Sequence, residues 1–347
     1  MRVLNITSII EEICTTEAAV GGPVERIDFL GHSHSDVYRV KAGGRSFIAH
    51  AAPGGTEYLK RLHSNLEIVA VLKDDRIPRE VAWRNSNAAW AVLMYPEIPG
   101  NELNRSNVTD TVLTSLRDLL ARLHSIEDQG QPHNTLAGRI NEPSAFVAFG
   151  EAFIRRLADL PIRADRVRQH LDAMAAYVGE HASAFRVPTR LIHGDLHRSN
   201  IVSTGTTIGL LDWGDLTAGD YAFDLATLKF VLDAVAPRKS AEFIRELARQ
   251  YRDRFNDASL EVRMRFFLAL AGLVRAFNNA DDHAAFRAGR AWRVRACYLH
   301  SESQWHQPLR LDGGEVGAPA TRTEDWVLDM RQPLRGLFYL LAPRRVS

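Results

Sequence analysis

Three stretches decide the fold of this sequence: LIHGDLHRSN at residues 191–200, LLDWG at 210–214 and GDYAFDLA at 219–226. The first two contain short apolar runs, which predict strands that end where the polar residues begin. The third stretch predicts the start of a helix, where Asp220 and Asp224 suit the N-terminal cap and the first turn. The chain therefore gathers acidic and amide side chains near predicted strand ends.

These side chains suit phosphoryl transfer, which needs a base for the attacking hydroxyl and oxygen ligands for Mg²⁺. Asp195 and Asn200 lie five residues apart in one predicted loop, and Asp212 follows Asp195 by seventeen residues. One loop residue can face the acceptor hydroxyl while the other joins Asp212 at the metal. The alternative is that these residues form ordinary turns on solvated loops. No further His or Cys in this segment completes a zinc set with His193 and His197, so Mg²⁺ is favoured.

In order and spacing, the three stretches resemble the HGDxxxxN, DWxxxxxGDxxxDLA signature of the aminoglycoside phosphotransferase and choline kinase-like family, which has a protein-kinase-like fold. The resemblance implies that Asp195 is the catalytic base and that His197 lies close to the transferred phosphate. It implies Asn200 and Asp212 as the Mg²⁺ ligands. His193, Asp220 and Asp224 would mainly brace the loop.

The N-terminal part predicts a small sheet. Alternation of apolar and polar residues in Asp36–Val40 and Ser46–Ala51 predicts two strands, and the intervening Gly43 and Gly44 allow the positive φ angles of a tight hairpin turn. Leucines at spacings of three and four within residues 57–73 predict a helix that lies on this sheet. By the resemblance, this part would bind ATP or GTP as the phosphoryl donor.

The family resemblance also suggests nucleotide contacts at two places. The loop at residues 31–36 resembles the hairpin loop that covers the phosphates, with hydroxyl donors at Ser33 and Ser35. The alternative is an ordinary polar turn. Residues 91–100 resemble the link between lobes, where kinases of this fold bind adenine through main-chain groups. Pro96 and Pro99 have no N–H to donate. The predicted adenine-site residues are Met94, Tyr95, Glu97 and Ile98, with a buried core position as the alternative for Met94.

One position departs from the family pattern. His50 stands at or near the place on the third strand where the family usually has Lys or Arg to hold the phosphates. Glu67, on the following helix, resembles the family's partner for that cation, and a nearby carboxylate raises the pKa of a histidine. A histidinium paired with Glu67 could then replace the lysine. The alternatives are that Lys41 or Arg45 supplies the charge, or that His50 packs against the helix.

These patterns together predict an α+β, bilobal protein-kinase-like fold. A small N-terminal antiparallel sheet lobe with one helix spans residues 1–98, a larger and mostly helical lobe spans 99–305, and a C-terminal extension spans 306–347. Short strands at Thr189–Ile192 and Ile208–Leu211 are expected to pair with each other.

Composition restricts the partners. The 43 Lys and Arg residues balance 42 Asp and Glu residues, so no overall field favours nucleic acid or a membrane. Cys14 and Cys297 are too few for a disulfide framework or a cysteine-built metal site. We expect a cytoplasmic protein, either a monomer or a homodimer, without a signal peptide or a membrane span.

The function expected from the sequence is Mg²⁺-dependent transfer of phosphate from a nucleoside triphosphate to a hydroxyl of a small molecule, such as an antibiotic, sugar, amino alcohol or natural-product intermediate. The alternative, motivated by His50, is a pseudokinase or nucleotide-sensing binding protein with the same fold. If several arginines of the late helices converge on the acceptor site, they favour a neutral or anionic acceptor. The alternative for most of them is that they face water or pair with neighbours, and Asp281 and Asp282 keep an amino sugar open. These arginines are Arg265, Arg275, Arg287, Arg290, Arg293 and Arg295.

Overall fold

The computed structural model of the chain describes residues 6–32, 34–53, 57–85, 90–127, 146, 149–152, 154–155, 164–280 and 287–306, with only the backbone at 164, 277–280 and 287–296. The chain divides into two units. The first unit holds the described residues up to Leu119 together with Arg198–Leu216, and the second holds those of Leu120–His197 and from Thr217 onward. The predicted domain boundaries stay predictions. The division into units differs from the predicted boundaries, because residues 198–216 belong to the N-terminal unit.

The first unit contains a five-stranded antiparallel sheet in the order β1-β2-β3-β5-β4. Its strands are β1 (Val24–His32), β2 (Asp36–Ala42), β3 (Arg45–Pro53), β4 (Ala82–Asn85) and β5 (Trp90–Pro96). Gly43 and Gly44 connect β2 to β3 with φ angles of +55° and +72°, as the predicted hairpin turn requires. The predicted N-terminal sheet is confirmed.

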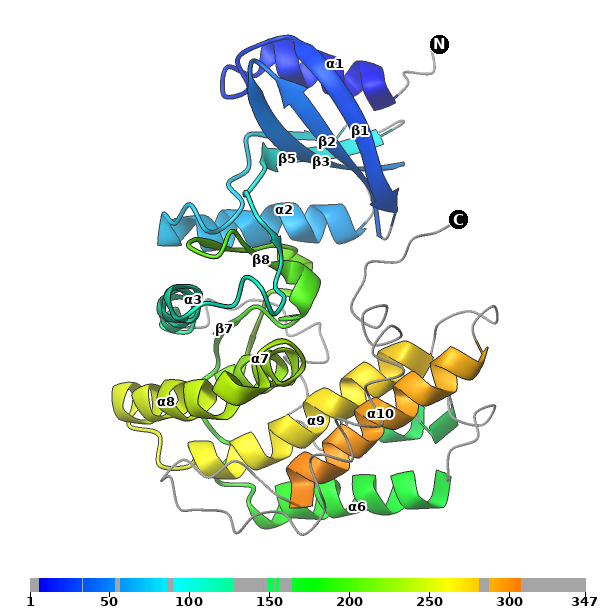
Figure 1. Cartoon of the computed structure of the whole chain (residues 1–347), viewed down its shortest axis with the longest axis vertical. Helices are drawn as coiled ribbons and strands as arrows, with labels where there is room; N and C mark the ends of the chain where they lie inside the picture. The colour runs from blue at the N-terminus through cyan, green and yellow to red at the C-terminus, as the bar shows by residue number, and fades with distance from the viewer. Residues whose placement is uncertain are drawn as a thin grey trace. The chain divides into compact units, whose positions relative to one another are not determined.

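Two helices pack on opposite sides of this sheet (Figure 1). Helix α1 (Ile6–Thr16) buries Ile9, Ile10 and Ile13 against alternate residues of β2, β3 and β5. Its isoleucines recur at spacings of three and four, a signal that the sequence interpretation missed. Helix α2 (Glu57–Val69) confirms the predicted helix and buries its leucines on the side of β3 and β5.

A second, three-stranded sheet completes the first unit. It has the order β6-β8-β9, formed by β6 (Asn101–Glu102), β8 (Ile201–Ser203) and β9 (Ile208–Leu210). Short 3-10 turns η2 (Arg198–Asn200) and η3 (Trp213–Asp215) flank β8 and β9, and η1 (Ala70–Leu72) follows α2. Helix α3 (Asp110–Leu123) begins in this unit and ends in the second.

The second unit is mostly helical. Its helices are α6 (Ala164–Glu180), α7 (Tyr221–Val235), α8 (Pro237–Phe255), α9 (Leu260–Ala280) and α10 (Arg287–His306). Helix α9 packs along α10 and against α7, which also packs against α8 (Figure 1). The mostly helical character predicted for residues 99–305 agrees with these helices. Residues 307–347, which include most of the predicted extension, lie outside the described residues.

The predicted pairing of two short strands is wrong. Strand β7 (Arg190–Ile192) pairs with β10 (Thr217–Gly219), whereas β9 pairs with β8. The turn at residues 204–207 closes β8 and β9 into a local hairpin, so β7 finds its partner further along the chain. Among the described residues, no helix is both long and apolar enough to span a membrane.

Candidate active site

The turn that carries Asp195 follows β7 in the second unit and is held by a buried carboxylate. The backbone turns at Gly194, whose φ is +78°. Oδ2 of Asp224 accepts a hydrogen bond from the main-chain N–H of His193 at 2.8 Å, and Oδ1 accepts one from Gly194 at 3.0 Å. Asp224 is completely buried in the first turn of α7. It therefore fixes the backbone just before Asp195, which confirms the predicted bracing role.

A buried histidine supports Asp224 in turn. Nε2 of His124 lies 3.0 Å from Oδ2 of Asp224, and Nδ1 is hydrogen-bonded to the hydroxyl of Tyr251 at 2.8 Å. The side chains of His124 and Asp224 are completely buried, where an unpaired polar group would be costly. The loop that carries Asp195 thus rests on a continuous chain of buried hydrogen bonds.

The carboxylate of Asp195 has a cationic partner at one oxygen and a histidine at the other. Arg275 Nη2, from α9, donates to Oδ1 at 3.2 Å, and His197 Nε2 lies 3.2 Å from Oδ2. Burial would raise the pKa of Asp195, but the hydrogen bond from His197 and the charges of His197, Arg275 and His193 bring that pKa well below its ordinary value. Asp195 is therefore held as a carboxylate, with 31% of its side chain exposed.

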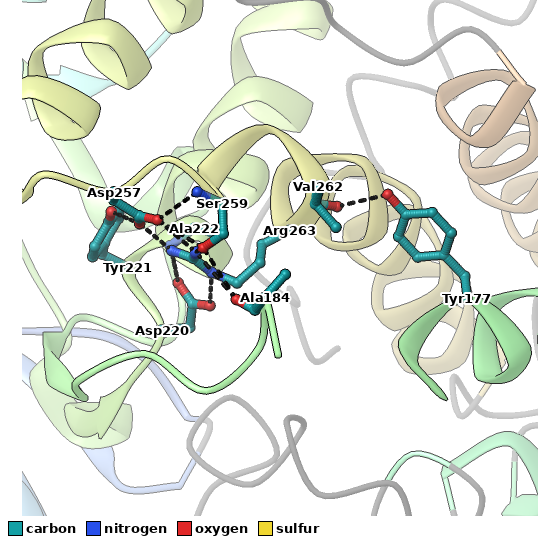
Figure 2. A network of polar contacts seen from close by, with 9 residues as sticks. All are labelled: Tyr177, Ala184, Asp220, Tyr221, Ala222, Asp257, Ser259, Val262 and Arg263. Atoms are coloured by element: carbon teal, nitrogen blue, oxygen red, sulfur yellow. Dashed lines mark hydrogen bonds and ion pairs between the residues drawn. The ribbon is translucent and has the colours of Figure 1, made fainter. Parts of the chain in front are cut away.

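Asp220 lies at the N-terminus of the same helix, α7, in a network of polar contacts (Figure 2). It is the N-cap of α7 and accepts from the main-chain N–H of Ala222 at 2.9 Å. Arg263, from α9, binds both Asp220 and Asp257 in a buried network that Tyr221 joins through its hydroxyl. The guanidinium of Arg263 and the carboxylate of Asp220 are 0% exposed. The predicted capping and bracing role of Asp220 is confirmed.

In the first unit, the structure brings together the segments of Asn200 and Asp212. The main-chain oxygen of Asn200 accepts from the N–H of Leu211 at 2.8 Å. Asp212 has a φ of +58°, which is uncommon for a residue other than glycine. The next residue, Trp213, is completely buried and donates Nε1–H to the oxygen of Leu210 at 3.0 Å. Trp213 thus anchors the turn that presents Asp212.

The donor chemistry of Asn200 and Asp212 fits Mg²⁺. An amide oxygen and a carboxylate oxygen are hard ligands, and Mg²⁺ in proteins usually takes one or two carboxylates together with phosphate oxygens and water. Asp212 Oδ1 accepts from the hydroxyl of Tyr58 at 2.7 Å, while Oδ2 has no hydrogen-bond partner among the described residues. Among the residues that the structure describes, no group of three or more His, Cys, Asp or Glu side chains is placed to hold a metal.

His50 lies on the face of the main sheet opposite α1, in a buried polar cluster of the first unit. Its Nδ1 is hydrogen-bonded to Ser35 Oγ at 3.0 Å and its Nε2 to the hydroxyl of Tyr95 at 2.9 Å. Burial lowers the pKa of His50 to about 4, against a smaller opposing effect of Asp212. His50 is therefore neutral near pH 7, and the predicted histidinium is not what this environment supports.

Glu67 and Met94 lie away from this cluster. Glu67, the predicted partner of His50, has a 67% exposed side chain 3.9 Å from His63. The expected pairing is thus replaced by the contacts of His50 with Ser35 and Tyr95. Met94 was predicted at the adenine site. It is completely buried in the core beneath α1, because it alternates with Tyr95 along β5 and faces the other side of the sheet.

The remaining predicted nucleotide residues are placed as follows. The main-chain N–H of Glu97 donates to Ser46 O at 2.9 Å, and its carboxylate pairs with Arg39, so this N–H is already engaged. Ile98 is half-buried. Ser33 lies outside the described residues.

Several residues at these loops were missed by the sequence interpretation. On α2, Tyr58, Arg61 and Asn65 contact residues of the turn 212–214. Their spacing of three and four along the helix was the available signal, but it is weak beside the leucine stripe. Arg275 was noted only as one of many late arginines, and nothing local to it indicated its contact with Asp195.

Solved structures with the same fold include three phosphotransferases of low sequence identity. An apo form of aminoglycoside phosphotransferase APH(4)-Ia (a thermostable mutant) has a TM-score of 0.57 at 14% identity, covering 84% of this chain and 98% of that one. A ternary complex of APH(2")-IIa with streptomycin and ATP gives 0.52 at 15% identity, covering 88% and 97%. An ethanolamine kinase of Plasmodium vivax gives 0.57 at 10% identity, covering 86% and 89%.

The sequence comparison is more decisive than these structures, which show the fold alone. No curated protein matches the chain by sequence. The profile described as the phosphotransferase enzyme family (APH) matches residues 27–267, from the main sheet to α9. Since this match covers well over half of the 347 residues, the chain belongs to the phosphotransferase enzyme family.

Proposed function

We propose that this phosphotransferase is a Mg²⁺-dependent kinase that transfers the terminal phosphoryl group of ATP or GTP to a hydroxyl of a small molecule. Asp195 is the catalytic base. The observation that carries the proposal is the setting of Asp195: its carboxylate is kept ionised by His197 and Arg275, on a turn that Asp224 holds through two main-chain hydrogen bonds. A base fixed in this way suits a reaction that depends on positioning.

In the proposed reaction, one carboxylate oxygen of Asp195 accepts a hydrogen bond from the acceptor hydroxyl and orients its oxygen toward the terminal phosphorus. The bond from that phosphorus to the bridging oxygen of the nucleotide breaks as the new oxygen–phosphorus bond forms. The hydroxyl proton passes to Asp195, and the nucleoside diphosphate leaves. Because its pKa is low, Asp195 acts mainly by orienting the hydroxyl and takes the proton late.

Asn200 and Asp212 would hold Mg²⁺, which neutralises charge on the terminal phosphates when it is bound. His197, beside Asp195, would lie close to the transferred phosphate. The neutral cluster of Ser35, His50 and Tyr95 would contribute hydrogen bonds rather than a positive charge to the nucleotide.

The acceptor is proposed only as a chemical class. Relatives with this fold have been crystallised with hygromycin B and with streptomycin, and another is an ethanolamine kinase. We propose a hydroxylated small molecule such as an antibiotic, sugar, amino alcohol or natural-product intermediate.

The experiment is a screen of such acceptors with purified protein, ATP or GTP and Mg²⁺, read by release of nucleoside diphosphate. The proposal expects acceptor-dependent release that EDTA abolishes and excess Mg²⁺ restores. If Mg²⁺ and nucleotide raise the thermal midpoint but no acceptor accelerates release, a pseudokinase or nucleotide-sensing protein is the better description. If nucleotide has no effect on the midpoint at any pH, both functions are contradicted.

A further inference from the structure

Helix α2 places three polar side chains on the turn that carries the proposed metal ligand. Tyr58 donates its hydroxyl proton to Oδ1 of Asp212 at 2.7 Å. Arg61 Nε donates to the main-chain oxygen of Gly214 at 2.6 Å, and Asn65 Nδ2 donates to that of Trp213 at 2.7 Å. All these residues belong to the first unit. Because the three donors are spaced at i, i+3 and i+7, they share one face of α2.

The approach of α2 to this turn is close. A Cβ atom added at Gly214 would lie 2.5 Å from Cε2 of Tyr58, a separation that side chains do not tolerate. The glycine thus allows the tyrosine ring to lie against the turn, and the ring's position brings its hydroxyl to Asp212. The contact therefore depends on a small residue on one side and an aromatic residue on the other.

The backbone conformation of Asp212 is unfavourable and is stabilised by the hydrogen bonds from α2. Its φ of +58° lies in the left-handed region, and a residue other than glycine held there costs on the order of 1–3 kcal/mol. Hydrogen bonds from α2 to the main-chain oxygens of the next two residues offset part of this cost. The bond from Tyr58 fixes the rotation of the carboxylate and engages Oδ1. Oδ2 then remains as the oxygen without a hydrogen-bond partner among the described residues.

We propose that Tyr58 is a positioning residue for metal binding, which holds the carboxylate of Asp212 in the orientation that Mg²⁺ requires. The inference rests on the proposed function, because it takes Asp212 to be a metal ligand. Residues that hydrogen-bond a metal ligand commonly change metal affinity by about 10–100-fold when they are removed. In this chain the support would come from a tyrosine hydroxyl of α2.

The test is Tyr58→Phe, which keeps the ring against Gly214 and removes only the hydroxyl. The matched control is Tyr177→Phe in α6, which removes a hydroxyl that donates to the main-chain oxygen of Val262 at 3.2 Å (Figure 2). Tyr177 and Val262 belong to the second unit, whereas Asp212 belongs to the first. Affinity for Mn²⁺, a paramagnetic substitute for Mg²⁺, is measured by electron paramagnetic resonance with the full chain and saturating ADP. Circular dichroism and the thermal midpoint report whether each variant is folded.

We expect Tyr58→Phe to weaken Mn²⁺ binding by about tenfold, while Tyr177→Phe binds as the wild type does. Asp212→Asn provides the distinction from the proposed function. If Asp212→Asn binds Mn²⁺ like the wild type, the metal assignment fails and the inference fails with it. If Asp212→Asn loses the metal while folded Tyr58→Phe keeps wild-type affinity, only the inference about Tyr58 is overturned.

A double variant sharpens the result. Where Asp212→Asn retains weakened Mn²⁺ binding, the Tyr58→Phe change should have little further effect on Mn²⁺ affinity, because Tyr58 acts on the metal only through the carboxylate of Asp212. Independent, additive losses would instead show that Tyr58 acts on the metal by another route, which contradicts the proposal.

Discussion

Arg275 Nη2 donates to Oδ1 of Asp195 at 3.2 Å, so the proposed catalytic carboxylate is paired with a guanidinium of α9 across 80 residues of sequence. The arginine side chain is 17% exposed, which limits the screening of its charge by water. Together with His197, this pairing keeps Asp195 ionised, and it links the proton affinity of Asp195 to a helix that the sequence motif does not include.

Removing this guanidinium should make Asp195 more basic. The folded-state pKa of Asp195 is lowered, so the carboxylate form persists to unusually low pH and is lost only as the pH falls through that value. In Arg275→Met we expect this pKa to rise, because one of the positive charges that lower it is removed, and this moves the acid limb of kcat/KM to higher pH. The measurement is a pH–rate profile with an acceptor found in the screen.

Arg265→Met is the matched control for that profile. Arg265 lies on the same helix and its guanidinium stacks over Trp305, with its centre 4.7 Å from the ring centroid. The acid limb of this variant should coincide with that of the wild type. An unchanged limb in Arg275→Met would show that the contact with Arg275 does not set the proton affinity of Asp195.

Neutral histidines that are buried or half-buried should make the protein sensitive to acid. Burial lowers the pKa of His50 to about 4 and, likewise, the pKa of His170 and His300 to about 4, from an ordinary value near 6.5. Their contribution is fully present above about pH 6.5 and is lost as the pH falls from there toward 4, because the unfolded chain binds the protons first. Each group lowers the free energy of unfolding by about 1.4 kcal/mol per pH unit in that window.

Urea unfolding between pH 7 and pH 4.5 measures this loss. His50→Gln removes one of the three groups and should flatten the decline, whereas replacement of the exposed His34 by Gln should leave the slope as it is. A wild-type free energy of unfolding that is constant between pH 7 and pH 4.5 is incompatible with neutral buried histidines.

Arg263 should matter for stability far more than an exposed arginine. Arg263→Met would leave Asp220 and Asp257 without their cation in a buried network (Figure 2). Breaking a buried ion pair in this way costs about 3–5 kcal/mol. Arg26→Met removes a pair with Asp28 in which the arginine side chain is 67% exposed, and should cost about 1 kcal/mol or less. Chemical denaturation of both variants measures the difference, and equal losses would argue against a structural role for the Arg263 network.

The sequence predicted the elements whose signals are local. Gly43 and Gly44 indicated the hairpin of β2 and β3, the leucine spacing indicated α2, and the acidic residues Asp220 and Asp224 indicated the start of α7. In each case the residues that carry the signal also make the turn, the buried stripe or the cap. Local periodicity is therefore sufficient for these features.

What the sequence did not predict depends on pairs of distant residues. Which of the short strands β7, β8, β9 and β10 pair with each other is set by tertiary packing. Strands as short as these carry little information in their sequence about their partner or register. His50 meets Ser35 and Tyr95 only because β2, β3 and β5 are neighbours in the sheet. The contacts of Tyr58 with Asp212 and of Arg275 with Asp195 are likewise set by the fold.

The central claim, that Asp195 is the base of a hydroxyl kinase, is tested most directly by turnover of Asp195→Ala with the best acceptor, alongside nucleotide binding by the same variant in the presence of Mg²⁺. Loss of general-base help is expected to slow turnover by about 10²–10⁴-fold, with the nucleotide Kd nearly that of the wild type, since Asp195 is not among the proposed metal ligands. Turnover of Asp195→Ala at the wild-type rate would contradict the account.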